Sequence, residues 1–249
     1  MDRRSAVGLL SSLLLGGCGG GGGASGEASA TTLGGKGAND SGPTATPIAQ
    51  GAPPTPASAA SGALSTNIAL WGDSITDIYF PTLRDLYPSR RVYNGGVSGQ
   101  TSMQIAARMT ADTDHKTWVT VFWYGHNNWT KDEVKADIAA SVASLAPGNR
   151  AFVVMSMLNW ADGTESRGQS RYQMITRVNG ELAATYPSNF LDISSYLVSL
   201  YNRSNAQDVQ DFQNDLPPSS LRFDTIHPND AGCNAISRKL QEFLSARGW

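Results

Sequence analysis

Cysteine and histidine are scarce in this chain, and long charged runs are missing. Its 249 residues include two cysteines and three histidines, with 19 basic and 21 acidic side chains. Because no extended basic run is present, nucleic acid is not expected as a partner. No His, Cys and Asp residues follow a spacing typical of metal ligands, so neither a metal nor another cofactor is predicted.

A hydrophobic run long enough to span a bilayer is also missing. Arg3 and Arg4 precede a short apolar stretch, Ala6 to Leu15, which is typical of a secretory signal. The next residues, Leu15-Gly16-Gly17-Cys18, resemble the bacterial lipoprotein box, whose cysteine is joined to diacylglycerol after cleavage. The resemblance implies a signal peptide over residues 1–17 and a lipid anchor at Cys18. The expected location is the bacterial cell envelope, at the outer membrane or the periplasmic face, with an ordinary signal peptide and secretion as the alternative.

Residues 18–65 lack aromatic side chains and almost lack large aliphatic ones. They consist of a glycine run followed by Ala, Ser, Thr and scattered prolines. Such a composition cannot bury enough apolar surface to offset the entropy of ordering, so a disordered tether is predicted. Its root-mean-square reach as a flexible coil would be roughly 35–42 Å. Residues 66–249 then form one domain, in which Cys233 is the only thiol and no internal disulfide is possible.

The domain alternates apolar strand-like runs with amphipathic stretches. This alternation predicts a three-layer α/β/α sandwich around a mainly parallel, five-stranded sheet. A final helix is expected from about Asn229 to Ala246, directly after His227-Pro228. The predicted strands are Asn67–Trp71, Arg91–Asn94, Thr117–Tyr124, Arg150–Leu158 and Asn189–Ile193, and two further predicted helices are Asp132–Leu145 and Tyr172–Tyr186.

Ser74 follows the first predicted strand in the run Gly72-Asp73-Ser74, which is where α/β sheets place their chemistry. Asp224 and His227 lie three positions apart near the end of the chain. A serine hydroxyl becomes nucleophilic when a histidine takes its proton and a carboxylate fixes the histidine tautomer. The alternative is that Asp73 and Ser74 only cap a helix.

Two further segments end predicted strands with residues suited to an active site. A glycine-rich turn runs from Asn94 to Gly99, where backbone N–H groups can point at a ligand. Gly125-His126-Asn127 follows the third strand, and an asparagine amide there can donate to a developing oxyanion. Each segment alone is also compatible with ordinary loop chemistry.

Taken in order, these four segments resemble the four sequence blocks of the SGNH hydrolases, a branch of the GDSL esterases and lipases. The resemblance covers Asn67 to about Ala231. It implies that Ser74 is the nucleophile, His227 the general base and Asp224 the residue that orients it. It further implies an oxyanion hole formed by the N–H groups of Ser74 and Gly99 and the side chain of Asn127. Asn128 replaces the aspartate common in the third block, and this change is expected to alter loop packing.

The remaining candidates concern substrate binding. His126 could contact substrate or pack within its loop, and Trp129 and Trp160 could bind a sugar face, line an acyl pocket or belong to the core. Trp123 is expected in the core, and His115 in a structural or solvated place. The segment from Ser194 to Phe223 is expected to form a wall of the cleft.

The sequence therefore predicts a lipid-anchored serine esterase that removes short acyl groups, acetyl above all, from a saccharide or another small ester. A long-chain lipase is less favoured because no extended apolar lid segment is present. A non-catalytic carbohydrate-binding lipoprotein and an acyltransferase of the same fold remain as alternatives.

Overall fold

A computed structural model of the protein describes residues 64–249. The predicted signal peptide, Cys18 and nearly all of the tether lie outside the described residues. None of the helices within residues 64–249 has the length and hydropathy needed to cross a membrane.

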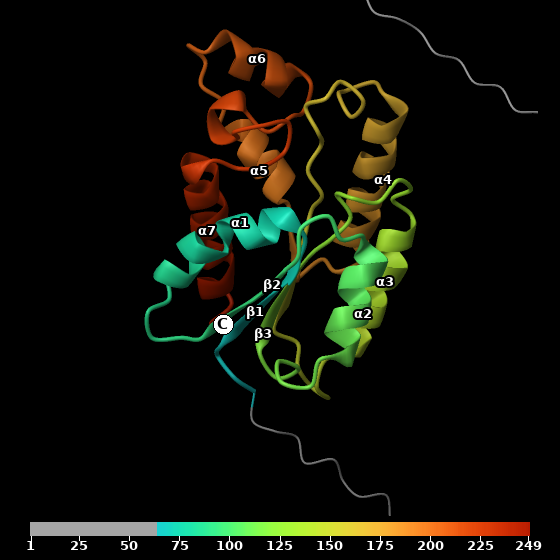
Figure 1. The fold of residues 1–249 in the computed structure, drawn as a ribbon, viewed down its shortest axis with the longest axis vertical. Helices are drawn as coiled ribbons and strands as arrows, with labels where there is room; N and C mark the ends of the chain where they lie inside the picture. The colour runs from blue at the N-terminus through green and yellow to red at the C-terminus, as the bar shows by residue number, and fades with distance from the viewer. Residues whose placement is uncertain (1–63) are drawn as a thin grey trace, which may run out of the picture. The chain divides into compact units, whose positions relative to one another are not determined.

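Five parallel strands form one sheet in the order β2-β1-β3-β4-β5, which confirms the predicted sheet (Figure 1). In β1 the residue Trp71 lies opposite Gly95 of β2 and Phe122 of β3. All side chains of β1 and β3 are buried, as expected for strands covered on both faces. The strands are β1 (Ile68–Gly72), β2 (Val92–Gly96), β3 (Val119–Trp123), β4 (Phe152–Met155) and β5 (Phe190–Leu191).

The fourth predicted strand was wrong in its length. It was expected to continue to Leu158, but β4 ends at Met155. Beyond it, the side chain of Asn179 accepts from the N–H of Met157 and donates to its C=O, at 2.9 and 3.0 Å. Because this amide takes the place of a neighbouring strand, Met157 and Leu158 are buried without being part of the sheet.

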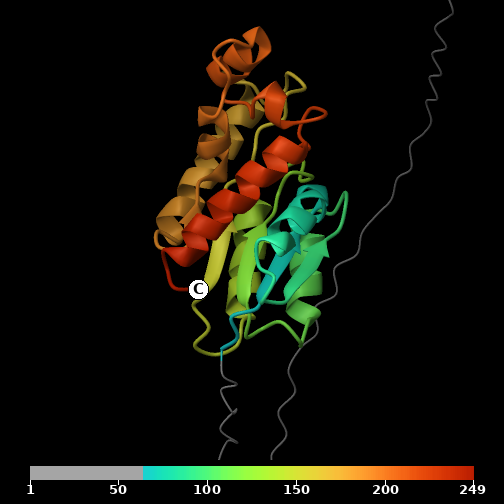
Figure 2. The same ribbon diagram turned by 90° about the vertical axis from the view of Figure 1, so that its left-hand side faces the viewer.

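Helices cover both faces of the sheet, as a three-layer sandwich requires (Figures 1 and 2). On one face Ile68 and Leu70 of β1 belong to the core that includes α1 and α7, and on the other Ala69 and Trp71 belong to the core that includes α2, α3 and α4. This alternation follows from the period of two along a strand. These helices are α1 (Ser74–Asp85), α2 (Ser102–Ala111), α3 (Glu133–Ala143), α4 (Ser170–Thr185) and α7 (Asp230–Ser245).

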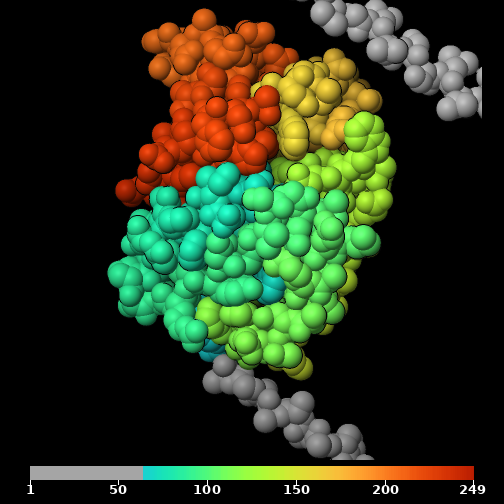
Figure 3. Space-filling model, viewed as in Figure 1, coloured from blue at the N-terminus to red at the C-terminus, as the bar shows by residue number. Residues whose placement is uncertain are grey.

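The segment after β5 is helical over much of its length. It forms α5 (Ile193–Ser199), α6 (Ala206–Gln213) and a short 3-10 helix, η1 (Ser219–Leu221). Its polar residues are partly internal, since the buried Asp208 carboxylate accepts hydrogen bonds from the backbone and hydroxyl groups of Ser220. In the space-filling view these orange residues stand above the rest of the domain (Figure 3).

The two ends of the described chain lie together. Residues Leu64, Ser65, Gly248 and Trp249 line one shallow cavity. Ser65 also donates its N–H to the C=O of Thr117, just before β3. Both ends therefore lie near the amino ends of the parallel strands.

Candidate active site

The junction between β1 and α1 positions the candidate nucleophile. Gly72 ends the strand, and a Cβ at this position would lie only 2.0 Å from the hydroxyl oxygen of Thr76. Asp73 then caps the helix, because its Oδ1 accepts the N–H of Ile75 at 3.1 Å. The capping interpretation is thus correct for Asp73. Ser74 is the first residue of α1, and its hydroxyl remains available for another partner.

Ser74, His227 and Asp224 lie within hydrogen-bond distance of one another in series. Ser74 Oγ is 2.8 Å from His227 Nε2, and His227 Nδ1 is 2.7 Å from Asp224 Oδ2. An ionised carboxylate only accepts, so the imidazole proton belongs on Nδ1 and leaves Nε2 free to accept from the serine. The arrangement can therefore take a proton from Ser74 Oγ.

The loop before α7 holds Asp224 in place. Asp224 Oδ1 accepts the N–H groups of Ile226 and His227 at 2.9 and 2.7 Å. Burial by itself would raise the pKa of the Asp224 carboxyl, but the hydrogen bonds from the His227 ring and from these two backbone groups lower it below its ordinary value. Asp224 is consequently a carboxylate at neutral pH.

The three predicted oxyanion-hole residues border one pocket with the triad. Gly99 has a φ of +78°, a conformation that favours glycine. Within residues 64–249 the N–H groups of Ser74 and Gly99 donate to no acceptor. Asn127 Nδ2 donates one proton to the C=O of Gln100 at 3.1 Å, which leaves its other proton free. The pocket has a volume of 450 Å³ and is lined by Ser74, Ile75, Ile78, Ser98, Gly99, His126, Asn127, Trp160, Phe223, Asp224, Ile226 and His227.

His126 is buried beneath the site and has both ring nitrogens occupied. The N–H of Leu158 donates to Nε2 at 3.2 Å, so the ring proton lies on Nδ1, which is 3.0 Å from Asp73 Oδ2. The side chain therefore connects the third strand end to the residue beside the nucleophile. Although His126 borders the pocket, its hydrogen bonds correspond to the packing role considered for it.

Lys131 and Glu165 form a buried ion pair that the sequence did not reveal as part of the site. Lys131 Nζ donates to the C=O groups of Gly125 and His126 at 2.9 and 3.1 Å and lies 3.9 Å from Glu165 Oε1. Burial lowers the pKa of Lys131 to about 8. Glu165 in turn accepts the N–H of Trp160 at 2.8 Å. The pair thus ties the loop that carries Asn127 to the loop that carries Trp160.

The two tryptophans considered for substrate binding lie in different places. Trp160 borders the pocket, whereas Trp129 is 82% exposed and packs against the Arg171 guanidinium, away from the pocket lining. Phe223, which the sequence did not single out, is 63% exposed and stacks on the His227 ring with centroids 5.7 Å apart. An apolar side chain next to a catalytic motif carries no sequence signal that distinguishes it from a core residue.

Several secondary expectations can also be placed. Trp123 is fully buried in the core, as predicted. His115 is not exposed but stacks on Tyr93 with centroids 3.9 Å apart, which supports its structural role. Asn128 is buried and hydrogen-bonded to the backbone and hydroxyl of Ser102, so it packs the loop. Cys233 is a free, buried thiol.

The expected cleft wall from Ser194 to Phe223 is only partly correct, because of that segment Phe223 alone borders the catalytic pocket. Residues of its helices α5 and α6 line a different cavity, together with residues of α4. Within residues 64–249 no three His, Cys, Asp or Glu side chains are grouped closely enough to hold a metal ion.

No protein-family model matches the chain. The tail spike protein of Salmonella phage epsilon15 is 25% identical over 148 residues, which cover 54% of this chain and 14% of that protein's length.

Solved structures that resemble the chain include a lipase, a lipase/acylhydrolase and an esterase. A GDSL-like lipase from Bacteroides thetaiotaomicron has 19% identity and a TM-score of 0.56, covering 73% of this chain and 89% of its own. A lipase/acylhydrolase from Enterococcus faecalis has 16% identity and a TM-score of 0.56, covering 74% and 97%. An acetyl xylan esterase has 18% identity and a TM-score of 0.53, covering 71% and 98%. The chain therefore has the α/β fold of the GDSL lipases and acylhydrolases, as its resemblance to the SGNH hydrolases implied.

Proposed function

We propose that this protein is a serine hydrolase of carboxylic esters. The observation that carries the proposal is the series of short contacts from Ser74 through His227 to Asp224, at 2.8 and 2.7 Å. A neutral imidazole in hydrogen-bond contact with a serine hydroxyl, oriented by a carboxylate, is the arrangement that activates a serine nucleophile.

In the proposed reaction His227 takes the proton of Ser74 as its oxygen attacks the ester carbonyl. The tetrahedral oxyanion is then stabilised by the N–H groups of Ser74 and Gly99 and by the free amide proton of Asn127. His227 passes the proton to the departing alcohol, and an acyl ester on Ser74 remains. A water molecule, deprotonated by the same imidazole, releases the carboxylic acid and restores the serine.

The preferred acyl group in this proposal is short, with acetyl first. The pocket has only 450 Å³ for both the acyl and the alcohol parts, and Ile75, Ile78 and Ile226 give it an apolar side. A saccharide is the proposed alcohol, and the acetyl xylan esterase among the similar folds supports this choice. Rates with p-nitrophenyl acetate, butyrate and octanoate should fall as the chain lengthens. A rate that rises toward octanoate would contradict the assignment.

Hydrolysis of p-nitrophenyl acetate tests the activity itself. We expect turnover by the wild-type protein and loss of it in Ser74→Ala, with an unchanged circular dichroism spectrum. Equal rates in both proteins would overturn the proposal and would leave a binding protein of the same fold.

We further propose that Cys18 anchors the protein in the bacterial cell envelope. The support is in the sequence, where Arg3 and Arg4, a short apolar stretch and Leu15-Gly16-Gly17-Cys18 stand in the order of a lipoprotein signal. Incorporation of a labelled fatty acid into the wild type but not into Cys18→Ala would support the anchor. Equal labelling of both proteins would contradict it.

A further inference from the structure

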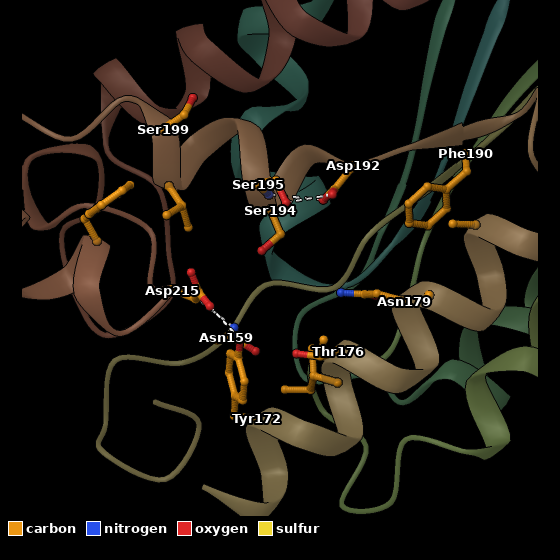
Figure 4. Close-up of a pocket in the computed structure, with 15 residues that line it drawn as sticks. Asn159, Tyr172, Thr176, Asn179, Phe190, Asp192, Ser194, Ser195, Ser199 and Asp215 are labelled. Atoms are coloured by element: carbon orange, nitrogen blue, oxygen red, sulfur yellow. Dashed lines mark hydrogen bonds between the residues drawn. The ribbon is translucent and has the colours of Figure 1, made fainter. Parts of the chain in front are cut away.

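A second cavity lies between α4 and α5, next to β5 at the edge of the sheet. Its volume is 460 Å³, within the range of small-molecule sites, about 300–1,000 Å³. Tyr172 and Thr176 border it from α4, and Ser194 faces them from the α5 side (Figure 4). We refer to it as the α4–α5 groove. None of the triad or oxyanion residues borders it.

The groove contains hydrogen-bonding groups that the protein itself does not satisfy. Asn159 is 4% exposed, and its Nδ2 donates to the C=O of Asp215 at 3.0 Å. Its Oδ1 has no hydrogen-bond partner within residues 64–249. The Ser194 hydroxyl, which points into the groove, also has none among these residues (Figure 4). A buried acceptor without a donor is unfavourable, so a ligand hydroxyl that reaches Asn159 Oδ1 would be favourable.

The charges of the remaining lining disfavour an anionic ligand. The two charged residues that border the groove, Asp192 and Asp215, are both acidic, and no basic side chain borders it. The Asp215 carboxylate is already neutralised, since it accepts from the Tyr172 hydroxyl at 2.5 Å and pairs with Arg167 at 2.6 Å. Asp192 has no basic partner within residues 64–249, so an anionic ligand would meet this uncompensated carboxylate.

Aromatic rings at the walls complete the pattern. Tyr172, Phe190 and Phe212 border the groove, and Phe212 is 40% exposed. Flat rings suit the apolar faces of a sugar, while amide, hydroxyl and carboxylate groups suit its hydroxyls. Among neutral small molecules, a saccharide presents both kinds of surface.

One short segment borders both the groove and the catalytic pocket. Asn159 lines the groove, and the next residue, Trp160, lines the catalytic pocket. The segment is fixed to the active site at both ends: the N–H of Leu158 donates to His126, and that of Ala161 donates to the C=O of Thr225 at 2.8 Å. A polymer bound across this segment would therefore reach both places.

We propose that the α4–α5 groove is a second binding site, for a neutral saccharide unit. Building on the proposed esterase function, the groove holds one part of a polysaccharide while an acyl group on another part of the same chain enters the pocket at Ser74. The groove would then set affinity for polymeric substrate without taking part in the chemistry.

The test uses the full chain and a variant with leucines on both walls, Thr176→Leu/Ser194→Leu. Leucine fills space and cannot hydrogen-bond a sugar. The matched control is Gln173→Leu/Thr185→Leu, at exposed positions of the same helix α4 that do not border the groove. Binding of xylohexaose, cellohexaose and the acidic hexagalacturonate is measured by calorimetry or NMR, because this readout does not depend on ester hydrolysis.

We expect a neutral hexasaccharide to bind the wild type and the control, and to bind the groove variant at least tenfold more weakly. With acetylated xylan the groove variant should show a raised KM, while all three proteins hydrolyse p-nitrophenyl acetate equally. Undiminished binding in the groove variant, no neutral binding to the wild type at millimolar concentration, or preference for hexagalacturonate would overturn the inference. If groove-dependent binding is found but no protein cleaves esters, the proposed function fails and the binding site stands.

Discussion

At the scale of single residues, the three consecutive residues at the end of β1 each have a different role. Gly72 allows the close approach of Thr76, Asp73 caps α1 and holds His126, and Ser74 directs its hydroxyl to His227. Because the cap comes from Asp73, the start of α1 does not depend on the serine side chain. Replacing Ser74 with alanine should therefore remove the nucleophile and leave the fold intact.

Asn127 supplies the one side-chain donor of the proposed oxyanion hole. Removal of such a donor costs about 2.7–4 kcal/mol of transition-state stabilisation, or roughly 10²- to 10³-fold in kcat. We expect this loss in Asn127→Ala, measured with p-nitrophenyl acetate, with little change in thermal stability. Ser98→Ala, another residue at the pocket, serves as the control. A kcat within a few-fold of wild type would exclude Asn127 from the oxyanion hole.

Because of Asp224, the stability of the protein should depend on pH in the acidic range. Its pKa in the folded protein is below the ordinary value of 3.8, so the carboxylate stabilises the fold above that value, and this contribution disappears as the pH falls through the lower, folded pKa. Compared by urea unfolding, the wild type should be more stable than Asp224→Asn at pH 6, and the difference should shrink below pH 4.

The same substitution should lower kcat strongly, because the amide no longer favours the tautomer with the proton on Nδ1. The loss should be smaller than that of Ser74→Ala, which removes the attacking oxygen. A stability difference that stays constant with pH would contradict the role assigned to the carboxylate, as would an unchanged kcat.

At the scale of elements, the loop that follows β3 depends on a buried cation. Lys131 holds the C=O groups of the two residues before Asn127, and Glu165 neutralises it. Removal of one member of a buried ion pair is expected to cost about 3–5 kcal/mol, because the other charge is left buried, and the remaining contact of Glu165 with Arg171 should keep the cost near the lower end.

Lys131→Met should therefore be destabilised by about 3 kcal/mol in urea unfolding. Lys131→Met should also have a lower kcat, because the loop carbonyls are no longer held. The double variant Lys131→Met/Glu165→Gln should regain part of the stability but should not regain kcat, since it does not hold these carbonyls either. KM should change little. Lys135→Met, which removes a more exposed lysine of α3, is the control. Recovery of kcat together with stability would show that Lys131 acts on the fold alone.

The sequence predicted the elements that depend on hydrophobic pattern and missed those that depend on distant partners. The predicted bounds of all five strands and of α3, α4 and α7 lie within a few residues of those in the structure. Their buried side chains repeat regularly along the sequence, which is why the pattern could be recognised. The predicted fourth strand ran too far because apolar Met157 and Leu158 are stabilised by Asn179, from α4. Helix α6 was missed because its buried residues are acidic, with Asp208 satisfied by serines of η1.

In the candidate site, too, residues that belong to a sequence motif could be predicted, and residues that depend on distant partners could not. Ser74, His227 and Asp224 could be singled out because a nucleophile, an acid and a base follow a recognisable order, and they lie within hydrogen-bond distance in series. Their catalytic roles stay predictions. Lys131, Glu165 and Phe223 could not be found in this way. From the sequence, a lysine in a loop is expected to be solvated. Only the fold shows that Lys131 is 1% exposed and faces the carbonyls of the loop that follows β3.

At the scale of the whole molecule, the two cores are completed within residues 64–249. Near the start of the described chain, the N–H of Ser65 donates to the C=O of Thr117. A protein that starts at residue 64 should thus match the full chain in thermal unfolding midpoint and in kcat with p-nitrophenyl acetate. A lower midpoint or a kcat reduced more than a few-fold would show that the preceding residues support the domain.

Leu64 and Trp249 lie together on the side of the domain opposite the catalytic serine. Both lie by the amino ends of the strands, whereas Ser74 follows the carboxyl end of β1. A carrier joined directly at residue 64 would therefore contact the domain at the amino ends of the strands, on the side opposite Ser74.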